Sequence, residues 1–158
     1  MKPNIKLFTI LLLLLGLIIA AGCASKGTNG AATSSNGVAV TIFKSITCGC
    51  CDLYASYMGK KGFNVEVKQT DDLTPIKNRY NVPSPMESCH TTVIGEYFVE
   101  GHVPVEAIEK LLAEKPDVAG IGMPGMPSGS PGMPGAKQGQ FIIYSINKDG
   151  TINEFMRI

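Results

Sequence analysis

Residues 38–53, VAVTIFKSITCGCCDL, decide the fold that this sequence predicts. Residues 38–43 are apolar and rich in β-branched side chains, which is typical of a short buried strand. Beyond the cysteines, apolar side chains recur at helical spacing from Leu53 until Gly59. The folded part of the chain is therefore expected to begin as a strand, a cysteine-containing loop and a helix.

The segments that follow predict an alternation of strands and helices. Residues 63–67 alternate apolar and polar side chains as a strand does, and Asp71-Asp72 opens a helix that tolerates Pro75 in its first turn. Two apolar runs flank Gly95-Glu96 as in a hairpin, and Pro104 starts another helix. The order β-α-β-α-β-β-α is that of an α/β, thioredoxin/glutaredoxin-like fold.

The C-terminal part adds a loop and a hairpin. Residues 120–139 are rich in Gly, Pro and Met, and we expect neither helix nor strand in them. Residues 141–146 and 151–158 flank the turn dipeptide Asp149-Gly150 and predict a β-hairpin that packs onto the same domain. A chain of 158 residues with 44% hydrophobic residues buries about one core, so residues 38–158 are predicted to form one domain.

The N-terminus has the pattern of an export signal. Two lysines precede an apolar run, residues 7–21, which is shorter than the roughly 20 residues that span a bilayer. Residues 20–23, Ala-Ala-Gly-Cys, resemble the lipobox of bacterial lipoproteins, except that Ala20 stands where Leu is usual. We therefore predict a signal peptide over residues 1–22 and lipidation of Cys23, with an uncleaved anchor or plain secretion as the alternatives.

Composition indicates which partners the protein meets. Residues 23–37 are small and polar, which predicts a flexible tether between the membrane, reached through lipidated Cys23, and a domain in the periplasm or at the cell surface. A net charge of +1 and the absence of Trp provide neither a basic surface nor stacking platforms. Nucleic acid is therefore not an expected partner.

Four cysteines remain if lipidation consumes Cys23: Cys48, Cys50, Cys51 and Cys89. An even number of cysteines in an exported domain is compatible with two structural disulfides. The spacing argues against that interpretation, because a bridge between Cys50 and Cys51, or between Cys48 and Cys50, distorts the backbone.

The position of the cysteines at the start of a helix favours a chemical role. If Thr47 is the N-cap, Cys48, Cys50 and Cys51 lie in the first turn, where free backbone N–H groups and the helix dipole stabilise thiolates. Thiolates bind soft metals and also attack disulfides. Cys48 and Cys51 have the C-x-x-C spacing of thiol–disulfide exchange, and Cys50 adds a sulfur that a metal site uses and exchange does not need.

Two later segments are predicted to face these cysteines. In this topology, the residues before the third strand and after the fourth lie beside the start of the first helix. These places hold Cys89-His90 and His102, which adds one thiol and both histidines of the chain as candidate ligands. In oxidoreductases of this fold, the first of these places normally holds a cis-proline.

Three methionines of the C-terminal loop are candidate auxiliary ligands: Met123, Met126 and Met133. Thioethers are soft ligands that favour Cu(I). The same side chains are equally compatible with an apolar role in which they hold the loop against the domain, and both interpretations stay open.

Four motifs together resemble a known family: Cys48-Gly49-Cys50-Cys51, Ser88-Cys89-His90-Thr91, Glu100-Gly101-His102-Val103-Pro104 and, over residues 125–133, GMPSGSPGM. They are similar to those of the exported, thioredoxin-like metal-binding proteins with a C-x-C-C motif, which include copper-resistance protein CopG. The resemblance implies copper bound by the C-x-C-C cysteines, with Cys89 and a histidine contributing. It also implies a role in copper resistance that includes interconversion of Cu(I) and Cu(II).

These observations predict an extracytoplasmic copper-binding protein. Its candidate ligands for Cu(I), held as a polynuclear thiolate cluster, are Cys48, Cys50, Cys51, Cys89, His90 and His102. Zinc, which also uses Cys and His ligands, is the less favoured metal. The alternative is a lipid-anchored thiol–disulfide oxidoreductase in which Cys48 attacks and Cys51 resolves, so enzymatic activity stays open. Proteins that deliver or receive copper are the expected partners.

Overall fold

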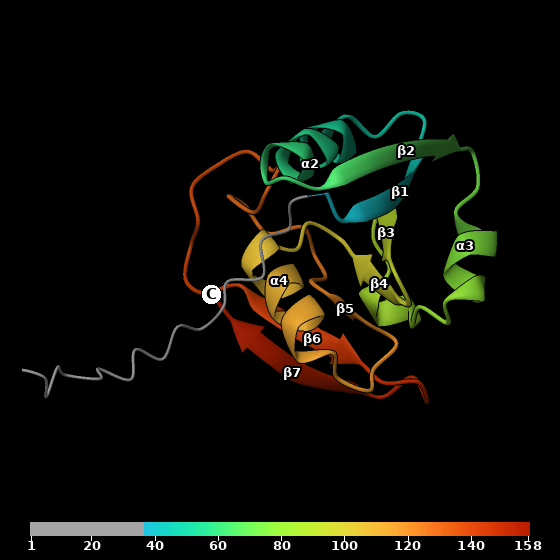
Figure 1. Ribbon diagram of the computed structural model, residues 1–158. Coiled ribbons are helices and arrows are strands. Elements are labelled where there is room, and N and C mark those ends of the chain that lie inside the picture. The colour runs from blue at the N-terminus through green and yellow to red at the C-terminus, as the bar shows by residue number, and fades with distance from the viewer. Residues whose placement is uncertain (1–36) are drawn as a thin grey trace, which may run out of the picture. The chain divides into compact units, whose positions relative to one another are not determined.

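The residues that the structure describes, 37–158, contain one seven-stranded sheet (Figure 1). The structure is a computed structural model. The predicted signal peptide over residues 1–22, Cys23 and the predicted tether as far as residue 36 lie outside the described residues. None of the helices in the described part has both the length and the apolar character that a membrane span needs.

Strands and helices alternate along the chain. The elements are β1 (Ala39–Ser45), α2 (Gly49–Lys60), β2 (Asn64–Thr70), α3 (Thr74–Arg79), the short 3-10 helix η1 (Ser84–Met86), β3 (His90–Ile94), β4 (Tyr97–Glu100), α4 (Val105–Glu114), β5 (Gly120–Gly122), β6 (Ile142–Ile146) and β7 (Ile152–Arg157). The predicted order β-α-β-α-β-β-α is confirmed by the elements from β1 to α4. The likeness to thioredoxins stays a prediction.

The sheet brings three strand ends together. Its strand order is β2-β1-β3-β4-β5-β6-β7. β1 and β2 run parallel and are joined by α2, whereas β3 and β4 form the predicted antiparallel hairpin around Gly95-Glu96. Lys44 at the end of β1 pairs with His90 at the start of β3, and Thr91 pairs with Glu100 at the end of β4. The start of α2, which carries the cysteines, follows this end of β1.

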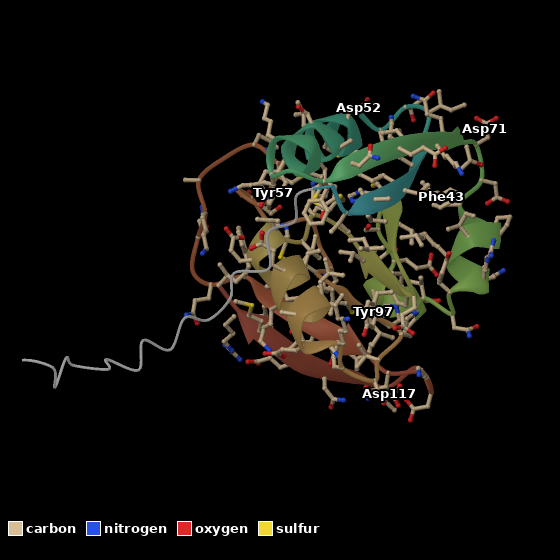
Figure 2. The ribbon with its side chains drawn as sticks, viewed as in Figure 1. Phe43, Asp52, Tyr57, Asp71, Tyr97 and Asp117 are labelled. Atoms are coloured by element: carbon tan, nitrogen blue, oxygen red, sulfur yellow. A yellow bond between two sulfur atoms is a disulfide. The ribbon has the colours of Figure 1, made fainter. Side chains whose placement is uncertain are left out.

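Helices α2 and α4 pack against the same hydrophobic core and contact each other. Tyr54 and Met58 of α2 and Leu111 of α4 are fully buried in one cluster. The hydroxyl of Tyr57, which Figure 2 labels, accepts a hydrogen bond from the backbone N–H of Val105 at 2.9 Å. This contact fixes α2 against the start of α4.

One part of the predicted loop is a strand. Residues 120–122 form β5, which pairs parallel with β4 and antiparallel with β6, so the prediction of neither helix nor strand over 120–139 was wrong there. A Cβ at Gly120 would lie 2.3 Å from the carbonyl oxygen of Phe98. Glycine therefore lets β5 approach β4 where composition suggested a loop. Through β5, the predicted C-terminal hairpin, β6 and β7, extends the sheet.

The start of α3 also differs from the prediction. The helix begins at Thr74 instead of at Asp71-Asp72, because the Asp72 carboxylate accepts the backbone N–H of Thr74 at 2.8 Å from outside the helix. Pro75 lies in the first turn, as expected. The hydrogen bonds from Thr74 also hold the pKa of Asp72 below its usual value.

Gly120→Ala should destabilise the protein, because the added methyl group cannot be placed unless β5 moves away from Phe98. We expect the free energy of unfolding, measured with urea, to fall by about 1–3 kcal/mol, as for other overpacked sites. Gly59→Ala on α2 is the matched control, since a Cβ there meets no heavy atom within 4 Å and alanine favours a helix. Equal stability of the two variants would contradict this role of Gly120.

Candidate metal centre

The cysteines begin α2, one residue later than predicted. Cys48 is the N-cap of the helix, and Cys50 and Cys51 lie in its first turn. Thr47 is therefore not the N-cap: the backbone N–H of Cys48 donates to the carbonyl of Ser45 at 3.1 Å, and that turn leaves Thr47 outside the helix. The free N–H groups of the first turn still favour negative charge on these sulfurs.

Cys48 and Cys51 form a disulfide, and Cys50 and Cys89 are free thiols. The bridge spans a C-x-x-C turn with Cα atoms 5.4 Å apart, a separation that suits a disulfide. The alternative of two structural disulfides is therefore wrong for the cysteines within residues 37–158. The Sγ atom of Cys50 lies 3.5 Å from that of Cys48, so three sulfurs gather at the start of α2.

A buried lysine lies beside this turn. The side chain of Lys44 is fully buried, and its ammonium group donates to the carbonyl of Cys48 and to the carboxylate of Asp52, each at 3.2 Å. Asp52 marks this end of α2 in Figure 2. A positive charge here stabilises thiolates. Sequence reasoning missed Lys44, although the two-residue alternation of β1 places it on the buried face of the strand.

His90 and His102 lie beside Cys51, in the first turn of α2. His90 begins β3, His102 follows β4, and both are fully buried. Their ring centroids are 5.0 Å apart, and the ring of Tyr54 on α2 lies 4.7 Å from His90 and 5.3 Å from His102. The Tyr54 hydroxyl donates to the carbonyl of Val103 at 3.0 Å, which holds the ring against both imidazoles. The sequence pattern predicted Tyr54 only as one of the side chains that recur at helical spacing.

The imidazoles keep nitrogen lone pairs available. The Nδ1 atom of His102 lies 2.6 Å from the carbonyl oxygen of Pro131, which can only accept, so Nδ1 carries the proton and Nε2 the lone pair. Within the described part of the chain, neither Nε2 of His102 nor either ring nitrogen of His90 makes a hydrogen bond of normal geometry. A metal-binding histidine commonly donates its other N–H to a backbone carbonyl in this way.

Both imidazoles are neutral at physiological pH. Burial, with the nearby His102 and Lys77, lowers the pKa of His90 to about 3, against the raising effect of a contact with the Gly101 backbone. Burial also lowers the pKa of His102, against the raising effect of its hydrogen bond to Pro131. Neutral imidazole is the form that binds metals.

The candidate ligand atoms form two groups that share one sulfur. The Sγ atoms of Cys48, Cys50 and Cys51 all lie within 4.8 Å of one another, and so do the Sγ of Cys51 and one ring nitrogen each of His90 and His102. Cys48 and Cys50 are half-buried, whereas the three members of the second group are buried. Sulfur with imidazole is a donor set that suits copper or zinc.

Cys89 lies outside these two groups. It is half-buried, and its Sγ lies 3.7 Å from the Sδ of Met126, while its backbone carbonyl lies 3.7 Å from the Sγ of Cys51. Met123 is buried in the hydrophobic core, as expected of an apolar role, and Met133 is half-buried on the loop. Of the candidate methionines, Met126 is therefore the one whose sulfur contacts the sulfur of Cys89.

A buried carboxylate connects the segments that carry the histidines. Glu100, the last residue of β4, is fully buried and accepts hydrogen bonds from the backbone N–H of Ser88 at 2.6 Å and from the Thr91 hydroxyl at 2.7 Å. It also pairs with the ammonium group of Lys77. Burial raises the pKa of Glu100, and Lys77 with these hydrogen bonds opposes the rise. Sequence reasoning gave this carboxylate no role.

The C-terminal loop packs on the start of α2. Gly132 approaches the helix so closely that a Cβ there would lie 2.8 Å from the backbone nitrogen of Tyr54 and 3.0 Å from the carbonyl oxygen of Cys50. Its φ of +81° also favours glycine. Since the preceding residue, Pro131, accepts the hydrogen bond of His102, the loop joins α2 to that histidine.

The chain is similar to two solved structures, named copper resistance protein CopG, form 1 and form 2. Each is 36% identical to this chain with a TM-score of 0.72, and the matches cover 78% of this chain and 98% and 99% of theirs. A family model described as a protein of unknown function, DUF411, matches residues 86–133, which include Cys89, His90 and His102. No curated protein matches the chain.

The metal-free protein should lose stability as the pH falls below 6.5, the ordinary pKa of histidine. Because burial lowers the folded-state pKa of His90 to about 3, the unfolded chain takes up the proton first. The stabilisation is thus complete above pH 6.5 and is lost between these two values, with a slope of up to about 1.4 kcal/mol per pH unit. Urea unfolding from about pH 7 to about pH 4.5 measures this slope. His90→Asn should make it shallower, and an unchanged slope would assign the acid sensitivity to other groups.

Proposed function

This chain belongs to the family of the copper resistance protein CopG, and on that premise we propose that it is a copper-binding protein of copper resistance that holds Cu(I). One observation carries the proposal: a group of three sulfurs and a buried group of one sulfur and two imidazoles share Cys51. Thiolate and imidazole are ligands that copper accepts, and soft thiolates select Cu(I).

The sulfurs are the proposed binding site of a polynuclear Cu(I) cluster. Thiolate sulfur can bridge two metal ions, and Cys48, Cys50 and Cys51 lie close enough together to share several. Cys89 supplies the fourth thiolate, with Met126 beside it as an auxiliary ligand. Copper loading requires two-electron reduction of the Cys48–Cys51 disulfide to two thiols by an external thiol reductant, because the thiolate is the form of cysteine that binds metals.

Interconversion of Cu(I) and Cu(II), with one electron per ion exchanged with an external redox partner, is the finer part of the proposal. Sulfur favours Cu(I), whereas imidazole also suits Cu(II), so a centre with both ligand types around one sulfur accommodates either oxidation state. His90 and His102 are the peripheral ligands in this scheme. Zinc accepts the same ligand types but is less favoured, since sulfur ligands outnumber imidazoles.

Thiol–disulfide exchange is the second candidate function, and the Cys48–Cys51 disulfide is the observation that favours it. Cys48 is half-buried and would attack, and Cys51 would resolve. The surroundings favour copper instead. Cys50 adds a free thiol that exchange does not need, and Cys89-His90 stands where an oxidoreductase of the predicted fold has a cis-proline.

The proposed place of action is outside the cytoplasm. The apolar run over residues 7–21 and the Ala-Ala-Gly-Cys sequence support export and lipidation of Cys23. The polar residues 23–37 would then tether the domain to the membrane. Proteins that deliver or receive copper are the proposed partners, and a net charge of +1 speaks against nucleic acid.

Cys89→Ser should lower the copper bound per protein by roughly a quarter or more, because it removes one of four thiolates. His102→Ala should cause a smaller loss, since imidazole is peripheral to the sulfurs. Elemental analysis of protein that is purified without oxygen, reduced and then loaded with Cu(I) measures both losses, and insulin reduction is assayed on the same samples.

The same variants test the second candidate function. An oxidoreductase should keep most of its exchange activity in Cys89→Ser, because Cys48 and Cys51 remain. Unchanged copper in Cys89→Ser, together with thiol-dependent insulin reduction by the wild type, would decide for the enzyme.

Cys23→Ala should release the protein from the membrane fraction without changing its copper content, because the tether separates the proposed anchor from the site. Cell fractionation followed by elemental analysis of the released protein measures both outcomes. A variant that stays in the membrane fraction would show that the apolar N-terminal run is an uncleaved anchor.

A further inference from the structure

Burial divides the candidate ligands into an outer and an inner group. Cys48 and Cys50, the outer cysteines, are half-buried at the start of α2. Cys51, His90 and His102, the inner triad, have no exposed surface. The inner triad combines one sulfur with two nitrogens, whereas the outer cysteines offer sulfur alone. The two groups therefore differ in both access and chemistry.

The inner triad holds buried polar atoms that make no hydrogen bond of normal geometry in the described part of the chain. These atoms are Nδ1 and Nε2 of His90 and Nε2 of His102. An unsatisfied buried polar group destabilises the folded state, and native proteins rarely keep several together. One cation bound by a nitrogen of each ring would remove two of these costs at once.

The surroundings of the inner triad restrict its movement. The carbonyl of Pro131 directs the lone pair of His102 to Nε2, and the ring of Tyr54 packs against both imidazoles. The carboxylate of Glu100 holds the strand ends from which the two histidines project. Groups that orient a ligand in this way raise the affinity of metal sites.

We propose that Cys51, His90 and His102 form an inner site for one divalent ion of the Zn²⁺ class, which binds without the outer cysteines. One thiolate with two neutral imidazoles is a donor set for Zn²⁺ and related ions, and soft Cu(I) prefers sulfur. Three protein ligands leave a coordination position for a small molecule or for a neighbouring metal. This inference rests on the proposed function, which places Cu(I) at the sulfurs.

Co²⁺ is a suitable probe, because it replaces Zn²⁺ and its thiolate charge-transfer absorption reports the number of sulfur ligands. The full-length protein is purified in detergent, reduced and titrated without oxygen. We expect one Co²⁺ per protein with the absorption of a single thiolate, displaced by Zn²⁺. A band intensity typical of three thiolates would overturn the inference.

Two sets of variants distinguish the inner site from the sulfur site. Cys48→Ser with Cys50→Ser should keep the Co²⁺ spectrum and lose more than about half of the bound Cu(I). His90→Gln with His102→Gln should weaken Co²⁺ binding at least about tenfold and retain most of the Cu(I). Loss of Co²⁺ binding in the first pair, or its retention in the second, would contradict the inner site.

Single substitutions provide the controls for folding and for the proposed function. Cys51→Ser keeps both imidazoles and should abolish the charge-transfer band, whereas Cys89→Ser should leave the Co²⁺ spectrum unchanged while its copper content falls. Wild-type protein that binds Cu(I) but not Co²⁺ would overturn the inner site alone. Protein that binds Co²⁺ but not Cu(I) would overturn the proposed function alone.

Discussion

The buried carboxylate of Glu100 is bound by the ammonium group of Lys77, the hydroxyl of Thr91 and the backbone N–H of Ser88. These groups come from α3, from β3 and from the segment before β3, so one side chain connects parts of the chain that are distant in sequence. A buried charge without its partner costs about 3–5 kcal/mol. Separating the ends of β3 and β4 therefore costs free energy. The distance between the two histidines depends on this constraint.

Local sequence patterns predicted the secondary-structure elements that depend on local interactions. Alternation and helical spacing predicted the elements from β1 to α4, and their order was enough to place both histidines beside the start of α2. The misses depend on contacts between distant segments. Residues 120–122 become a strand because Gly120 fits against Phe98, and Thr47 leaves the helix because Ser45 and Cys48 form a turn. The orientation of Cys89 toward Met126 is likewise a tertiary contact.

Charged residues were the hardest part of the site to predict. Lys44 and Glu100 are both fully buried, against the general tendency of such residues to face solvent. Only their partners make that burial tolerable, and Asp52 and Lys77 are identified by the fold and not by spacing. The candidate metal ligands could be named from the sequence because Cys and His are residue types that bind metals. The role of the charged groups that hold these ligands in place depends on tertiary contacts, which the residue type alone does not reveal.

Tyr54 has a further, optical consequence. The chain has five tyrosines and no tryptophan, so its intrinsic ultraviolet fluorescence comes from tyrosine alone. The ring of Tyr54 lies 4.7 Å from one imidazole and 5.3 Å from the other, and its surroundings exclude solvent. A copper ion held by these imidazoles would quench the emission of a fluorophore beside it. If such an ion binds there, Tyr54 would report the occupancy of the site without an added label.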